Sequence, residues 1–164
     1  MRKISSILFL MLFAFISCTE THDNVVISKN FTNHEWGRFE YLKGILDIKK
    51  APQEYDIIME IVVDDIYPNP YEAHQTECFL PFNLTIKNPD DNGKRSKDYR
   101  FMLKDKDGNW KAEEKNGLYT FKLPVIEEMT FSEKGTYNFV IENKYSKDPL
   151  YGIKSMTLKC IKSK

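Results

Sequence analysis

Histidine and cysteine, the residues from which catalytic and metal sites are most often built, are scarce here, with three of each among 164 residues. The sequence has no Gly-x-Ser-x-Gly nucleophile motif, no His-Glu-x-x-His zinc motif and no glycine-rich phosphate-binding loop. The histidines are His22, His34 and His74, and no motif supplies them with the partners of a catalytic triad. We therefore expect that the protein is not an enzyme and uses no cofactor.

Net charge is also lacking, because 24 lysine and arginine residues balance 24 aspartate and glutamate residues. A chain without a positive excess offers little electrostatic attraction to the phosphates of nucleic acid or to an anionic membrane surface. We therefore expect no nucleic-acid partner. Any attachment to a membrane must depend on something other than a basic surface.

No segment carries the sustained apolar stripe of an amphipathic helix. Apolar and polar residues instead alternate over short stretches separated by turn-forming residues, which is the pattern of β-strands. Tyr55–Val63 shows the clearest alternation, and apolar residues on both of its faces predict a central strand. Val25–Ser28 is predicted as an edge strand. Further strands are expected within Trp36–Ile48 and at Cys78–Lys87, Tyr99–Lys104, Leu118–Val125, Thr136–Glu142 and Ile153–Ile161.

These segments amount to about eight strands at fairly regular spacing. Pro124 is expected to end its strand, and residues 88–97 are expected to form a charged turn. The chain also contains 11 phenylalanines, nine tyrosines and two tryptophans, which favour strands and bulky cores. The sequence therefore predicts a single all-β domain over residues 25–164, an antiparallel β-sandwich of the jelly-roll-like or immunoglobulin-like kind.

The first residues have the organisation of an export signal. Arg2 and Lys3 form a positive head, and Ile4–Ile16 is an apolar core too short to be a permanent transmembrane helix. The core ends with Ser17 and Cys18, a junction that resembles a bacterial lipobox. In a lipobox the cysteine is lipidated and becomes the new N terminus. The alternative is an ordinary cleaved signal with a chance cysteine beside it. We expect the lipobox, with residues 1–17 removed as the signal peptide.

Residues 18–24 are then the lipidated Cys18 and a short polar tether. Removal of the signal takes two basic residues away and leaves 22 basic against 24 acidic residues. The lipid itself should hold the protein at the membrane, since buried methylene groups contribute about 0.8 kcal/mol each. Thr19 stands where an inner-membrane retention signal more typically has aspartate. We therefore expect an outer-membrane anchor, with the domain on the periplasmic face rather than the cell surface.

One stretch has partial spacing for a calcium site. Asp105, Asp107 and Glu114 fit three ligand positions of an EF-hand loop, but Leu103 at the first position has no oxygen to offer. The flanking residues are also predicted as strands rather than helices. We interpret Asp105–Asn109 as a hairpin turn whose aspartates accept hydrogen bonds from backbone amides, and no metal site is predicted.

Two cysteines remain after the anchor, Cys78 and Cys160. An exported protein folds in an oxidising compartment, where these two residues could form a disulfide. The alternative is two separate buried thiols that behave as small hydrophobic residues. His74 and Glu77 lie close to Cys78 in sequence, but this group lacks the fourth ligand that tetrahedral zinc needs.

Four aromatic residues are candidates for an exposed ligand or partner surface. Tyr67 and Tyr71 flank a proline-restrained loop, and loops on a rigid scaffold often carry function. Trp110 lies in the predicted hairpin and could add to such a surface. Trp36 is interpreted as a core residue. A sandwich of this size with exposed aromatics could bind glycans through Tyr67, Tyr71 and Trp110.

Several short motifs follow one another in a characteristic order. They are Trp36 before Phe39 and Asp47, Tyr55-Asp56-Ile57 leading to Tyr67-Pro68, Asn83-Leu84, Asp107-Gly108-Asn109-Trp110, Phe131 before Gly135-Thr136-Tyr137, and Asp148-Pro149-Leu150 before Gly152-Ile153. In this order, behind a lipobox, they resemble the gliding-motility lipoprotein family GldH of Bacteroidetes over about Val25–Ile161. That family offers no established catalytic residues.

The resemblance implies a cell-envelope accessory protein that supports surface motility or linked secretion machinery through contacts with envelope proteins. From the sequence we therefore expect an exported outer-membrane lipoprotein that acts as a non-catalytic accessory or scaffold of such machinery. The alternative function is a lipoprotein that binds glycans through its sandwich domain.

Overall fold

The computed structural model describes residues 24–71 and 78–163, and within them every regular element is a β-strand. The strands are β1 (Asn24–Asn30), β2 (Glu35–Trp36), β3 (Leu42–Ile48), β4 (Gln53–Asp64), β5 (Phe79–Lys87), β6 (Lys94–Met102), β7 (Glu114–Lys115), β8 (Leu118–Phe131), β9 (Gly135–Asn143), β10 (Leu150–Tyr151) and β11 (Ile153–Lys162). The all-β prediction is confirmed, with eleven strands rather than about eight. The three additional strands, β2, β7 and β10, have two residues each and are too short to show a period.

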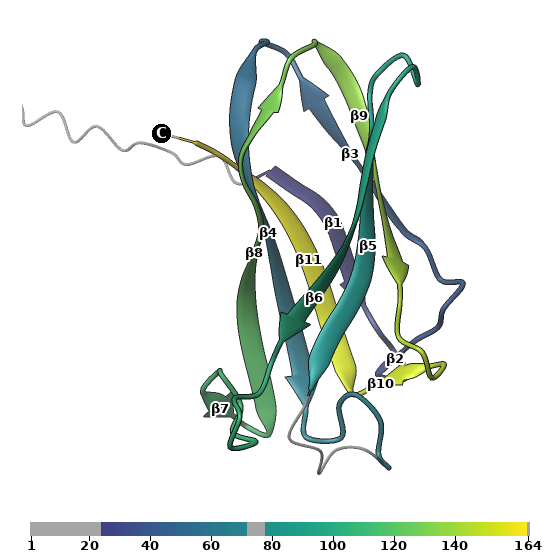
Figure 1. Ribbon diagram of the computed structural model, residues 1–164, viewed down its shortest axis with the longest axis vertical. Helices are drawn as coiled ribbons and strands as arrows, with labels where there is room; N and C mark the ends of the chain where they lie inside the picture. The colour runs from purple at the N-terminus through teal and green to yellow at the C-terminus, as the bar shows by residue number, and fades with distance from the viewer. Residues whose placement is uncertain (1–23, 72–77, 164) are drawn as a thin grey trace, which may run out of the picture.

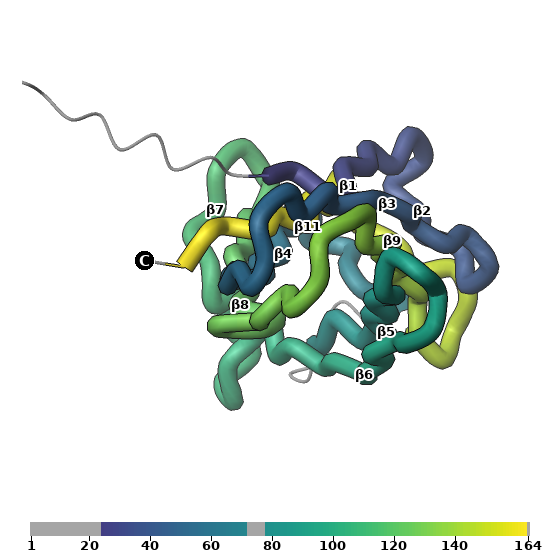
Figure 2. The backbone as a smooth tube through the Cα atoms, turned by 90° about the horizontal axis from the view of Figure 1, so that it is seen from above, coloured from purple at the N-terminus to yellow at the C-terminus, as the bar shows by residue number. Residues whose placement is uncertain are grey.

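Two antiparallel sheets face each other and form an elongated sandwich (Figures 1 and 2). One sheet has the strand order β1-β11-β4-β8-β7, and the other has the order β3-β9-β5-β6. The short strands β2 and β10 pair separately at one end of the molecule. The predicted antiparallel sandwich is therefore confirmed.

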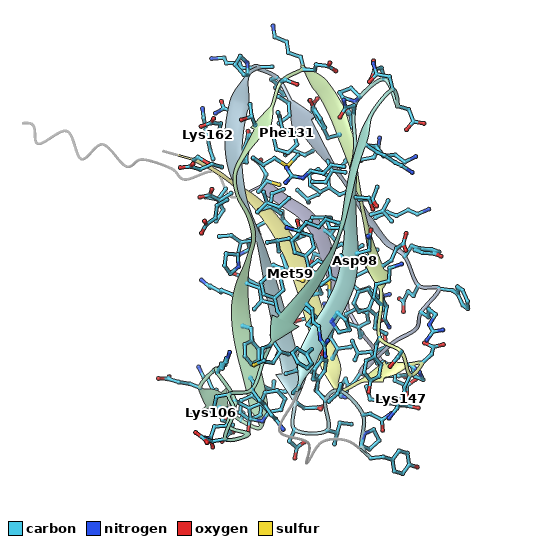
Figure 3. All side chains as sticks on the ribbon, viewed as in Figure 1. Met59, Asp98, Lys106, Phe131, Lys147 and Lys162 are labelled. Atoms are coloured by element: carbon cyan, nitrogen blue, oxygen red, sulfur yellow. The ribbon has the colours of Figure 1, made fainter. Side chains whose placement is uncertain are left out.

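Strand β4 lies at the centre of the five-stranded sheet, between β11 and β8, as its apolar pattern predicted. Ile57, Met59, Ile61 and Val63 alternate along it and are fully buried. Each such side chain contributes about 1.5–3 kcal/mol through its removal from water. The facing sheet supplies matching alternate residues, which are Phe82, Leu84 and Ile86 on β5 and Tyr137, Phe139 and Ile141 on β9. The core lies between these two rows, and Met59 marks its middle (Figure 3).

Two strand boundaries differ from the prediction. Strand β8 continues through Pro124 to Phe131, although we expected the proline to end it. Proline is tolerated here because β7 pairs with only Leu118 and Tyr119, which leaves the rest of β8 as an edge strand. The pairing with β4 also shifts its register on both sides of Ile57, close to the proline. Strand β6 begins at Lys94, inside the region predicted to be a turn.

The sandwich is closed along one side, where β1 and β3 come together (Figure 2). Strand β1 is an edge strand, as predicted, and a bulge interrupts its pairing with β11 at Val26. Gly44 of β3 packs against this bulge so tightly that a Cβ at Gly44 would overlap the carbonyl oxygen of Val26 and lie 2.6 Å from the Ile27 side chain. Only glycine allows the two backbones to approach this closely.

Candidate functional site

The structure brings three of the sequence motifs together at the end of the sandwich where β2 pairs with β10. These motifs are Trp36, Tyr67-Pro68 and the segment Asp148–Gly152, and we call this region the motif end. Trp36 pairs with Leu150 across the two short strands, and both side chains are fully buried. Trp36 is therefore the core residue that the sequence predicted. Lys147 marks this end of the molecule in Figure 3.

Gly152, at the end of the segment Asp148–Gly152, packs against the Tyr67-Pro68 motif. Its φ angle is +73°, and a Cβ there would lie 2.6 Å from both the Tyr67 backbone nitrogen and an Asp64 carboxylate oxygen. The Tyr151 amide donates to the carbonyl of Pro68 over 3.0 Å, and the Asp64 amide donates to the carbonyl of Gly152 over 2.9 Å. The loop after β4 is thus held against the start of β11.

Arg38 ties the loop after β2 to the loop before β10. Its backbone amide donates to the Asp148 carboxylate over 2.7 Å. Its guanidinium donates to the carbonyls of Tyr145 and Ser146 over 3.1 and 2.7 Å. The sequence analysis missed Arg38, because its partners lie more than 100 residues away and no local pattern connects them.

Asn143 is a buried polar residue at the end of β9 that the sequence analysis also missed. Its side-chain amide donates to the carbonyl of Trp36 over 2.7 Å, and its side-chain oxygen accepts from the Tyr145 amide over 2.8 Å. The Trp36 indole in turn donates to the carbonyl of Glu40 over 2.8 Å. Both polar functions of the buried amide are therefore satisfied, which fixes β2 against β9.

A small charged cluster lies beside the motif end. The ammonium group of Lys154 is 2.7 Å from the ring nitrogens of His34 and 3.6 Å from the carboxylate of Asp64. Asp64 also accepts a hydrogen bond from the Ile66 amide. These contacts bind the turn before β2 to β4 and β11.

The three aromatic residues proposed as a ligand surface do not form one. Tyr67 is fully buried, and its hydroxyl donates to the carbonyl of Phe79 over 2.8 Å. Burial raises the pKa of the Tyr67 phenol well above its ordinary value. The prediction of an exposed Tyr67 is therefore wrong, because the core takes up its ring and a distant carbonyl satisfies its hydroxyl. Tyr71, by contrast, is 93% exposed.

Trp110 is also a packing residue. Its ring stacks on Tyr119 of β8 with the centroids 4.6 Å apart, and it lies 6.2 Å from the ring of Phe121. The ammonium group of Lys104 lies 4.5 Å from the Trp110 ring centroid. The indole is half-buried in these contacts, so the predicted exposed surface is reduced to Tyr71 alone.

The two cysteines of the domain are both free and buried, so the alternative of separate thiols is the one that the structure contains. Burial raises the pKa of each thiol to about 12, and a nearby Lys104 ammonium only partly opposes this at Cys78. At neutral pH both groups are protonated thiols rather than reactive thiolates.

Asp105 caps the predicted hairpin turn. Its carboxylate accepts hydrogen bonds of 2.9 Å from the amides of Asp107 and Asn109, as predicted. The hydrogen bond from Asn109 is the main cause of a lowered pKa for this carboxyl. The carboxylate of Glu114 accepts a hydrogen bond from the Gly117 amide. The carboxylates of Asp105 and Glu114 therefore each stabilise a turn by accepting backbone hydrogen bonds, instead of binding a shared metal ion.

Across residues 24–71 and 78–163, no three His, Cys, Asp or Glu side chains are grouped closely enough to hold a metal ion. The same residues contain no helix of the length and apolarity needed to cross a membrane. Cys18, the tether up to Asp23, and the His74 and Glu77 pair lie outside the described residues.

The fold defines the class of protein, an antiparallel β-sandwich domain. A family model described as GldH lipoprotein matches residues 25–160, from β1 almost to the end of β11, and the chain belongs to this family. It is accordingly a lipid-anchored membrane protein. No curated protein matches the chain.

Proposed function

We infer that the protein is an outer-membrane lipoprotein that serves as a non-catalytic accessory or scaffold of gliding motility or of linked secretion machinery. The match of the GldH lipoprotein model to residues 25–160 carries this proposal. The lipobox at Cys18 supports the anchor, and Thr19 after it supports the outer membrane with the domain on the periplasmic face.

The course of β1 supports a role in which the motif end is presented to other envelope proteins. The strand starts at Asn24 beside Cys160 and ends at Asn30 beside Ser155, next to the motif end. Seven residues of strand place these two ends about 20 Å apart. Asn24, the first described residue, therefore lies well away from the motif end, and we propose that the motif end faces away from the anchor.

Two loops of the motif end carry exposed aromatic side chains. Phe39 is 79% exposed and follows Arg38, which is fixed to the β9–β10 loop. Tyr71 is 93% exposed and follows Pro68, which is fixed to β10. Aromatic residues held by a rigid scaffold are favoured contact residues in protein interfaces. We propose these two side chains as the partner-contacting residues of the accessory role. Tyr67 and Trp110 are packed into the domain, so they do not provide the exposed aromatic surface that the glycan-binding alternative needs.

The experiment compares cells that carry the wild-type gene, a gene deletion and a Cys18→Ala variant. We expect both altered strains to lose spreading or secretion, and the variant protein to leave the outer-membrane fraction. Cys78→Ala is the matched control, because it also removes a thiol but leaves the lipobox intact. Unchanged spreading, secretion and envelope-complex abundance in the deletion strain would overturn the proposal.

A further test addresses the two aromatic residues. A Phe39→Ser and Tyr71→Ser double variant should fold and localise as wild type, because neither side chain packs in the core. We expect it to reduce the amount of envelope protein that co-purifies with the lipoprotein after mild detergent extraction. Ile45→Ser is the control, because Ile45 is also largely exposed but lies in the middle of strand β3, opposite Asn138, and not in a loop of the motif end.

A further inference from the structure

Several strands lie at the edges of the two sheets. Three of these edge strands, β1, β3 and β8, are protected against pairing with a further strand. Strands β1 and β3 pack against each other, and β1 carries the bulge at Val26. Strand β8 is an edge beyond Tyr119, but Pro124 and the register shifts around Ile57 interrupt it. Short length, bulges and prolines are the usual devices that prevent another strand from joining a sheet.

Strand β6 is not short, bulged or interrupted by proline, and the one protective feature that it carries is its set of charged side chains. It pairs with β5 over nine residues, from Lys94 to Met102, without a register shift, and it contains no proline. Within residues 24–71 and 78–163, no strand pairs with its other edge. This is the long, regular edge of the molecule.

The direction of the free backbone groups follows from the ladder. The Leu103 amide donates to Cys78, and Gly93 accepts from Asn88, so odd-numbered residues between them bond to β5. The even-numbered residues therefore direct their N–H and C=O groups away from the sheet. They are Lys94, Ser96, Asp98, Arg100 and Met102, and all five are exposed.

The charge of this edge is strongly positive although the whole chain is nearly neutral. Lys94, Arg95, Lys97 and Arg100 lie on β6 with a single acid, Asp98, which accepts a hydrogen bond from Asn83 over 2.7 Å. In the described part of the chain, none of the four basic side chains has an ion-pair partner. Asp98 marks the strand in Figure 3.

Aromatic rings lie next to the free edge on the inner face of β6. Tyr99 and Phe101 stack in parallel, with ring centroids 6.2 Å apart, and both stack on Phe82 of β5. Both rings are only half-buried. A strand added at this edge would cover them.

We propose that β6 accepts an extended, acidic segment of a partner protein as an additional antiparallel or parallel strand of the four-stranded sheet. Main-chain hydrogen bonds to the even-numbered residues provide the pairing, as in other cases of strand addition. Carboxylates on the outer face of the segment meet Lys94 and Arg100, and apolar residues on its inner face cover Tyr99 and Phe101. The inference goes beyond the proposed function, and it uses a different surface from Phe39 and Tyr71.

The charge argues against a second copy of this chain as the occupant. Pairing of β6 with another β6 would place the basic residues of the two strands opposite one another. Like charges directly opposite each other in a sheet are destabilising. The same lysines and arginines that discourage self-association thus favour an acidic partner.

Amide hydrogen exchange on the acylated protein in detergent tests the proposal, with an alternating Val/Glu nonapeptide as the probe. Before addition, the odd-numbered amides of β6 should be protected and the even-numbered ones should exchange rapidly. With the peptide, exchange at Ser96, Asp98 and Arg100 should slow at least tenfold. An alternating Val/Lys nonapeptide is the charge control and should have no effect.

Two substitutions at Ser96 separate strand addition from other binding. Ser96→Pro removes an outward N–H without removing a hydrogen bond to β5, so the domain should fold but lose the slowed exchange. Ser96→Ala removes the side-chain hydrogen bonds to Asn83 and Thr85 and should keep it. Lys94→Glu with Arg100→Glu places acids on the outer face, where the Glu side chains of the peptide lie, and should weaken peptide binding at least tenfold.

Three results would overturn the inference. They are unchanged exchange with the Val/Glu peptide, equal effects of the acidic and basic peptides, and protection of the same amides by self-association without peptide. Each leaves the proposed accessory role intact, because that role is judged by the deletion strain and not by β6.

Discussion

The side-chain amide of Asn143 donates a 2.7 Å hydrogen bond to the backbone carbonyl of Trp36, 107 residues earlier in the chain. Its oxygen accepts from the Tyr145 amide. An Asn143→Ala variant would leave both backbone groups without this partner in a buried site. We expect the free energy of unfolding to fall by about 1–3 kcal/mol, measured by urea denaturation. Asn138→Ala, an exposed position on the same strand, should change it by less than about 0.5 kcal/mol.

Gly152 should tolerate no side chain. A Gly152→Ala variant combines a left-handed backbone, which costs an L-residue about 1–2 kcal/mol, with a contact of 2.6 Å to the Tyr67 nitrogen. We expect a loss of more than about 2 kcal/mol in thermal unfolding. Gly37→Ala is the control, because no atom lies within 4 Å of a Cβ there. Equal melting temperatures for the two variants would contradict this account.

The centre of the core can be tested at Ile61. Ile61→Asp would place an unpaired carboxylate in the middle of β4, between Phe121 and Met156 on the neighbouring strands. Burying such a charge costs more than the whole stability of a typical domain, so we expect no folded protein by circular dichroism. Ile45→Asp, on an exposed part of β3, should fold.

The buried thiols predict how stability depends on alkaline pH. Burial raises the pKa of Cys78 and Cys160 from about 9 to about 12. Between these values the unfolded thiols lose protons that the folded thiols keep, so stability is complete below pH 9 and falls as the pH rises toward 12. Urea denaturation from pH 8 to 11 should show this fall.

The contribution of the thiols is isolated by a Cys78→Ala and Cys160→Ala double variant. Its stability should be lower at every pH, because two buried groups are shortened, but its decline above pH 9 should be shallower than that of the wild type. Parallel curves for the two proteins would contradict the assignment. In the native wild-type protein, both thiols should also react slowly with a thiol reagent at pH 8 and rapidly after denaturation.

The strand pattern was the most predictable part of the fold. Alternation over Tyr55–Val63 predicted a strand, because every second side chain of β4 faces the core. Apolar residues on its other face predicted its central position, which the structure confirms. Trp36 was assigned to the core correctly. The C-terminal end of β8 was not predictable from the sequence. Proline ends a strand only where a neighbouring strand needs a hydrogen bond from the N–H that proline lacks. Among the described strands, none pairs with the outer edge of β8 beyond Tyr119, so no partner there needs that N–H.

The site was less predictable than the fold. Tyr67, next to a proline in a loop, has the local features of an exposed residue, but its burial depends on Gly152, 85 positions later. Arg38 and Asn143 have no local signal, since their hydrogen bonds connect distant segments. The motifs of the resemblance include Trp36, Tyr67-Pro68 and Asp148–Gly152, so they identified the residues of the motif end. Their order in the sequence did not predict that they contact one another.

The path of β1 has a mechanical consequence. Tension between a lipid at Cys18 and a partner bound at the motif end would act along β1, from Asn24 toward Asn30. The hydrogen bonds between β1 and β11 would then be loaded in shear, all at the same time, rather than peeled apart one after another. The contact of Gly44 with Val26 lies on this line and adds a steric stop to sliding. In the proposed role, the first strand of the domain would transmit force through the sandwich without being pulled off it.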